Sequence, residues 1–117
     1  MDDAIVVLTN TPTRDHAQRI ADALVDGALA AAVQVAGATT STYVWRGRRR
    51  RSREWTCVIK SVRARLPEIE RVIKAIHPYE LPAIVALPVC GGSAEYLEWW
   101  LDRVAGGAAG TPRRPPE

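Results

Sequence analysis

The spacing of apolar residues differs from segment to segment, and the order of these segments along the chain constrains the fold more than any other feature. Two short β-branched runs are apolar at nearly every position, which is typical of strands buried on both faces. Two segments repeat apolar residues every three or four positions, as amphipathic helices do, and two more are rich in β-formers around an arginine run. The segments lie at residues 4–8 (strand), 17–25 (helix), 29–45 (strand), 54–62 (strand), 66–76 (helix) and 83–89 (strand). This order predicts an α+β, ferredoxin-like β-α-β-β-α-β sandwich.

Residues that cap, bend or end these elements agree with this assignment. Thr11 or Thr13 can cap the first helix, and Gly27 is placed to end it. Gly37 is expected to bend or bulge one long strand. The second helix must stop before Pro78, because the residue before a proline avoids the helical region.

The last segment with something to bury is a further helix, which Ser93 can cap. Its broad apolar stripe consists of Tyr96, Leu97, Trp99, Trp100, Leu101 and Val104. Residues 106–117 carry almost no large apolar side chains, so we expect a disordered tail there. We therefore predict a single domain over residues 1–105, with the extra helix at its C-terminal end.

The predicted sheet has more apolar surface than its own helices can cover. Two crossover helices lie on one face only, yet the strands are apolar on both faces. At about 25 cal/mol per Å², leaving the second face in water would be costly. Since the last helix can shield only part of it, we predict that identical copies associate into a symmetric homo-oligomer.

Basic residues are concentrated in one segment of the chain. Sixteen Lys and Arg against 13 Asp and Glu give a net charge of +3, but six arginines fall within residues 46–53, and the remainder is mildly acidic. This disfavours a broad nucleic-acid-binding face. Two interpretations of the cluster stay open: a solvated hairpin tip or an anion patch. The patch would consist of Arg48, Arg49, Arg50, Arg51 and Arg53.

The segment after the second helix places an imidazole, a phenol and a carboxylate between two prolines, Pro78 and Pro82, or directly beside them. Prolines stiffen the backbone, and stiff polar loops often carry function. His77 and Glu80 are candidate ligands for copper or another divalent cation. The alternative is a rigid turn at a subunit contact. Two ligands do not close a metal site, and no nucleophile or phosphate-loop motif occurs, so no enzyme is predicted.

Apolar runs in this chain fall far short of the roughly 20 residues that span a bilayer, so no membrane association is expected. The first residues do not resemble a signal peptide, which predicts a cytoplasmic protein. Cys57 and Cys90 are then expected to be reduced, buried thiols.

Several blocks of the sequence together resemble the CutA family, the divalent-cation tolerance proteins. The most specific is the histidine-proline-tyrosine run at residues 77–79. The matching blocks lie at residues 5–12, 23–25, 29–35, 41–47, 59–61, 76–84, 86–89 and 96–101. The resemblance implies a heat-resistant trimer similar to PII signalling proteins, with a role in divalent-cation tolerance and no catalysed reaction.

The resemblance also bears on the site. Some family members are given copper ligands at positions that hold Thr9, Ile76 and His77 here, so one ligand of three is kept and copper binding is expected to be weak. Tyr79, Lys60 and Trp45 are expected to line a ligand cleft between subunits. The alternative functions are a PII-like module that binds a small anionic ligand or nucleic acid through the arginines, and a scaffold for a partner protein.

Overall fold

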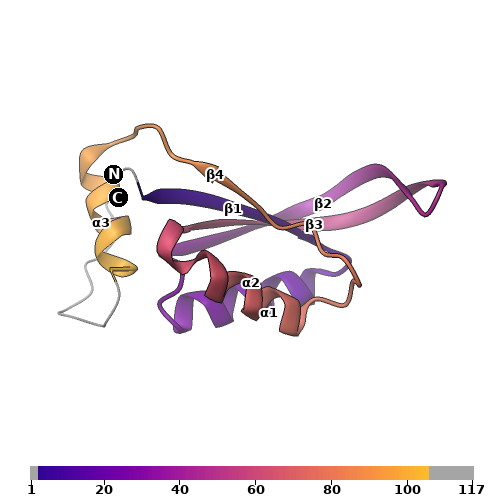
Figure 1. Cartoon of the computed structure of the whole chain (residues 1–117), viewed down its shortest axis with the longest axis horizontal. Coiled ribbons are helices and arrows are strands. Elements are labelled where there is room, and N and C mark those ends of the chain that lie inside the picture. The colour runs from indigo at the N-terminus through magenta and orange to yellow at the C-terminus, as the bar shows by residue number, and fades with distance from the viewer. Residues whose placement is uncertain (1–2, 106–117) are drawn as a thin grey trace.

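A computed structural model describes residues 3–105, and the predicted tail at 106–117 lies outside this range. A four-stranded sheet has the order β2-β3-β1-β4, and all of its neighbouring strands are antiparallel. Helices α1 and α2 lie against one face, and α3 lies at one end (Figure 1). The bounds are β1 Ala4–Thr11, α1 Arg14–Asp26, β2 Ala32–Trp45, β3 Arg48–Val62, α2 Leu66–Ile76, β4 Val85–Pro88 and α3 Ala94–Arg103. The predicted ferredoxin-like fold is confirmed.

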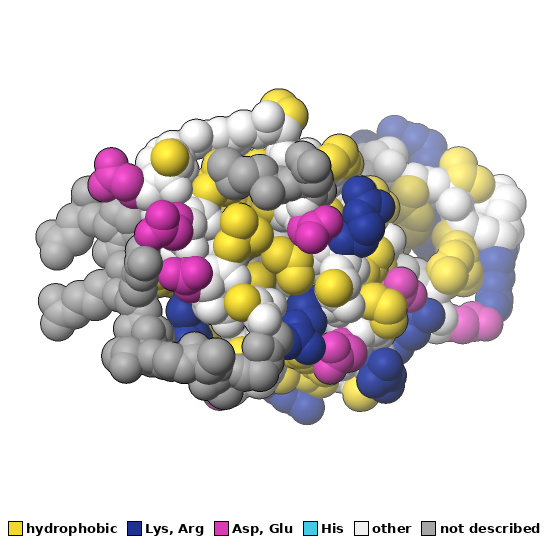
Figure 2. Space-filling view, turned by 60° about the vertical axis from the view of Figure 1, so that its left-hand side comes forward, with side chains coloured by type: hydrophobic (Ala, Val, Ile, Leu, Met, Phe, Trp, Pro, Cys, Tyr) yellow, Lys and Arg dark blue, Asp and Glu magenta, His cyan; other side chains and the backbone are white. Residues whose placement is uncertain are grey.

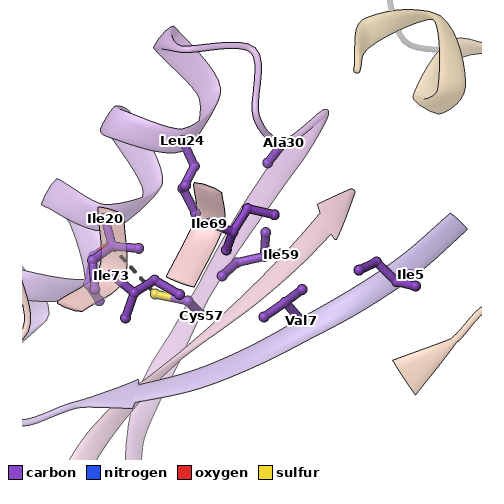
Figure 3. Close-up of a cluster of buried hydrophobic side chains, with 10 residues drawn as sticks. Ile5, Val7, Ile20, Leu24, Ala30, Cys57, Ile59, Ile69 and Ile73 are labelled. Carbon is purple, nitrogen blue, oxygen red and sulfur yellow. Dashed lines mark hydrogen bonds between the residues drawn. The ribbon is translucent and has the colours of Figure 1, made fainter. Parts of the chain in front are cut away.

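The main core lies between α1, α2 and the sheet. Alternate residues of β1, such as Ile5 and Val7, point toward the helices and are buried. Figure 3 shows Ile20 and Leu24 of α1 pointing toward the same cluster, which includes Cys57 of β3. The periodicity of the sequence therefore placed these apolar faces correctly.

The capping residues act as the sequence predicts. Thr13 is the N-cap of α1, where its hydroxyl accepts a hydrogen bond from the backbone N–H of His16, and Gly27 follows the last turn. Helix α2 ends at Ile76, two residues before Pro78. Ser93 caps α3 by accepting from the N–H of Tyr96.

The hairpin of β2 and β3 is longer than the sequence suggests and extends beyond both helices (Figure 1). A register shift between Ala36 and Thr39 confirms the expected irregularity at Gly37. The tip is the pair Arg46 and Gly47, both with positive φ, as the type I′ hairpin turn requires. The arginines that follow were expected in the tip, but they lie in β3, because pairing with β2 satisfies their backbone groups.

A second cluster lies on the other face, where α3 covers one end of the sheet. Trp99 and Trp100 pack there with Leu97, Ala31 and Val62. Figure 2 brings this end of the molecule forward and shows hydrophobic side chains gathered among charged ones.

The rest of this sheet face is uncovered. Leu87 and Val85 of β4 pair with Val6 and Leu8 of β1, and they are 46% and 52% exposed. Because Val6 and Leu8 point away from the helices, this set forms an apolar patch on the open face of the sheet, with Val6 at its border against the α3 cluster. Among the described helices, none has the length and apolar character needed to cross a membrane.

Candidate functional site

The loop after α2 is fixed to the end of β1 by His77. This side chain is only 7% exposed, and its Nδ1 accepts a hydrogen bond from the backbone N–H of Tyr79 at 3.1 Å. Nε2 therefore carries the proton and donates to the backbone carbonyl of Asn10. The imidazole ring also lies 4.8 Å from the Tyr79 ring, centroid to centroid. His77 thus holds the loop in position.

The same loop brings Tyr79 onto a carboxylate of β3. The Tyr79 hydroxyl donates a 2.8 Å hydrogen bond to Oε2 of Glu54, which is only 5% exposed. Burial, together with the hydrogen bond to Glu54 and its negative charge, raises the pKa of Tyr79, so the hydroxyl keeps its proton. This contact joins the loop to the base of the hairpin.

A cavity of about 650 Å³ opens between this loop and the hairpin. Arg46 at the hairpin tip crosses its rim to Glu80, with 2.6 Å between Nη2 and Oε1. This ion pair is exposed, so it adds little stability, but it links the two walls. The walls are formed by Ser41, Thr42, Tyr43, Trp45, Arg50 and Glu54 of the hairpin, by residues 79–83 of the loop, and by Asn10 of β1.

The cavity gathers some of the residues that the sequence singles out and leaves others elsewhere. Two residues of the predicted ligand cleft, Tyr79 and Trp45, line it together with the predicted metal ligand Glu80. Lys60 does not belong to this group. Its Nζ donates to the Tyr96 hydroxyl at 2.9 Å and lies over that ring, at the α3 end of β3. His77 lies behind the loop and does not contribute to the lining of the cavity.

The arginine cluster lies along β3 and does not form a compact hairpin tip. Arg46 lies over the Trp45 ring at 5.3 Å and Arg53 over the Trp55 ring at 5.6 Å, so each covers a tryptophan of its own hairpin. Arg48, Arg49, Arg50 and Arg51 are exposed, and no acidic side chain lies within 4 Å of them in residues 3–105. Anion binding by the predicted patch stays a prediction.

The residues at the expected copper-ligand positions do not fit a metal site. Both ring nitrogens of His77 are already hydrogen-bonded, and Ile76 has no donor atom. Thr9 is fully buried and its hydroxyl has no partner in the described part of the chain, but a neutral hydroxyl is a poor ligand for a soft metal. Within residues 3–105, no three His, Cys, Asp or Glu side chains cluster as metal ligands.

The two thiols differ in surroundings. Cys57 is buried as expected, and burial raises its pKa to about 11, so it remains a neutral thiol. Its Sγ donates to the backbone carbonyl of Ala17 at 3.6 Å (Figure 3). Cys90 was expected to be buried, but it is exposed, because it follows the short strand β4 in an open connection to α3.

Two residues of the cavity were missed by reasoning from the sequence. Glu54 comes directly after the arginines, so in the sequence it is most simply interpreted as an acid that reduces the local positive charge. Tyr43 reads as an ordinary strand aromatic. The useful signal was alternation: in the observed register Tyr43 pairs with Arg50, four residues before Glu54, which places all three on one face of the hairpin.

Comparison with known proteins gives a consistent result. The family model described as CutA1 divalent ion tolerance protein matches residues 5–103. The divalent-cation tolerance protein CutA of Thermus thermophilus is 40% identical over 94 residues, which cover 80% of this chain and 91% of the relative.

Solved structures of such proteins share the fold. The Cut A1 structure from Thermus thermophilus has a TM-score of 0.81 at 39% identity and covers 83% of this chain and 94% of its own. CutA1 from the psychrotrophic bacterium Shewanella sp. SIB1 gives 0.83 at 39% identity, covering 86% and 94%. CutA1 from Oryza sativa gives 0.85 at 30% identity, covering 90% and 96%.

Proposed function

Since this chain belongs to the CutA family of divalent ion tolerance proteins, we propose that it acts in divalent-cation tolerance, including tolerance of copper, as a non-enzymatic homotrimer of the cytoplasm. The family match across residues 5–103 carries this proposal, because it extends from β1 to the end of α3. Metal is bound weakly, since His77 has no free nitrogen and Glu80 is paired with Arg46.

A binding role suits the geometry better than catalysis. The nearest imidazole to the cavity, that of His77, is committed to two backbone partners and cannot act as a general base without releasing the loop. The two cysteines, Cys57 and Cys90, are free thiols, which a cytoplasmic location allows. Plant relatives are named as chloroplastic and one archaeal structure as periplasmic, so location varies among relatives.

The proposed function is tested by growth and by direct titration. In a bacterial strain that lacks its own family member, expression of this chain is expected to restore growth at copper concentrations that inhibit the empty-vector control. The titration uses metal-free protein with Cys90→Ser, which removes the exposed thiol. Copper is expected to give weak heats, because His77 is hydrogen-bonded through both nitrogens and Glu80 is paired with Arg46. The His77→Ala variant in the same background should give equal heats.

These two measurements separate the parts of the proposal. Failure to restore growth would remove the role in copper tolerance. Tight, stoichiometric copper binding that disappears in the His77→Ala variant would show that His77 leaves its two backbone partners and ligates the metal.

The homotrimer is supported by the apolar patch of Val6, Leu8, Val85 and Leu87, which a second copy can cover. Sedimentation equilibrium is expected to give three times the chain mass of 12.8 kDa. Leu87→Asp should lower this mass toward one chain, because it places a charge within the covered patch. Ala75→Asp adds the same charge on the exposed side of α2 and should leave the mass unchanged. A single-chain mass for the unaltered protein would contradict the trimer.

A further inference from the structure

The carboxylate of Glu54 is buried without a positively charged partner. It is 5% exposed, and within residues 3–105 no Lys, Arg or His nitrogen lies within 4 Å of it. Its hydrogen bond from the Tyr79 hydroxyl reaches Oε2, and no hydrogen bond to Oε1 occurs within residues 3–105, while Glu54 itself lines the cavity. Buried carboxylates in folded proteins are normally paired with a cation, because the charge loses its hydration. The buried carboxylate of Glu54 therefore lacks the cation that would normally accompany it.

The surroundings of Glu54 suit an organic cation. The rings of Tyr43, Trp45 and Tyr79 line the same cavity, and aromatic faces attract ammonium groups. The volume of about 650 Å³ lies within the usual range for small-molecule sites. A Ca²⁺ ion fits less well, since it takes six to eight oxygen ligands and Glu54 supplies the only unpaired carboxylate among the described lining residues.

The other charges of the cavity do not cancel that of Glu54. Glu80 is matched by Arg46 at the rim. Arg50 lies four residues from Glu54 along β3, so their Cα atoms are about 13 Å apart at the usual rise of a strand. Arg50 is exposed, so solvent screens its charge far more than that of the buried Glu54. Within residues 3–105 the charge of Glu54 thus has no partner cation within 4 Å.

We propose that this cavity binds a small organic molecule with a protonated amine, whose ammonium group contacts Glu54 and whose apolar part lies against Tyr43 and Trp45. This proposal goes beyond divalent-cation tolerance and does not depend on it. Tyr79 positions Glu54 through the 2.8 Å hydrogen bond and forms part of the wall.

The test compares two ligands of one shape on the unaltered full chain. Isothermal titration with 2-phenylethylamine and with the neutral 2-phenylethanol is expected to give at least tenfold tighter binding of the amine. Glu54→Gln keeps the size of the side chain and removes its charge, so amine affinity should fall at least tenfold and alcohol affinity should not change. Glu95→Gln, which removes an exposed carboxylate of α3, is the matched control and should bind as the unaltered chain does.

Each other outcome overturns the proposal. Equal binding of amine and alcohol would show that the cavity does not recognise charge, and absence of amine binding would show that no such site exists. If Glu54→Gln lacks the unaltered circular dichroism spectrum, Trp45→Leu takes its place, and unchanged amine affinity there contradicts the site. A change of oligomeric mass in Glu54→Gln without amine binding to the unaltered chain would assign the cavity to a neighbouring copy.

Discussion

Replacing Trp100 by alanine is expected to lower the free energy of unfolding by about 3–5 kcal/mol, the range typical of buried tryptophans. Trp100 is buried in the cluster that attaches α3 to the end of the sheet. Its indole Nε1–H donates a 2.8 Å hydrogen bond to the backbone carbonyl of Ser61 in β3. The variant therefore loses apolar contact and leaves a buried carbonyl without its donor.

Urea unfolding followed by circular dichroism, at one fixed chain concentration, measures this loss without relying on tryptophan fluorescence. A fixed concentration is needed because association adds to the apparent stability. Trp45→Ala is the matched control: this tryptophan is half-buried at the cavity, and we expect a loss of about 1 kcal/mol or less. If both variants lost equal stability, Trp100 would not attach α3 to the sheet.

The parts of the fold that the sequence predicted well are those whose signal is local. Helix α1 has a clear period and is bounded by Thr13 and Gly27, residues whose chemistry favours the two ends of a helix. Helix α2 is likewise bounded by Pro67 and Pro78. The ferredoxin-like class followed from the order of elements along the chain, because two strand-helix-strand crossovers in one small sheet leave few arrangements.

The extent of the hairpin could not be predicted, because its stability comes from pairing between distant residues. The arginines of β3 have no preference for strands, and residues 48–53 extend the strand because β2 lies opposite with matching length. The same limit applies to the cavity. Glu54 and Tyr79 are 25 positions apart, and nothing near either one indicates the contact that His77 enforces.

Lys60 shows why a shared face is too weak a criterion for a site. It lies on the same face of β3 as Glu54, as strand alternation predicts. Six residues separate them, which is about 20 Å along the strand, so Lys60 contacts Tyr96 of α3 and not the cavity. Within one chain, distance along the strand therefore separates Lys60 from this cavity, and its place in a cleft between subunits stays a prediction.

Replacing His77 by alanine is expected to lower the free energy of unfolding by about 2–5 kcal/mol. The imidazole is buried and satisfies two backbone groups, the carbonyl of Asn10 and the N–H of Tyr79. Each group left without a partner costs about 1–3 kcal/mol where water cannot reach it. The loop then loses its attachment to β1, and the contact between Tyr79 and Glu54 should weaken with it.

Urea unfolding of His77→Ala measures this, with His16→Ala as the control because His16 is half-buried and, within the described residues, its ring hydrogen-bonds only to the nearby Thr13. We expect less than about 1 kcal/mol from the control. A histidine kept as a free metal ligand would behave like His16, since removing it leaves no backbone group unpaired. Equal, small losses from the two variants would therefore show that His77 does not fix the loop, whereas a large loss from His77→Ala alone assigns its nitrogens to the fold.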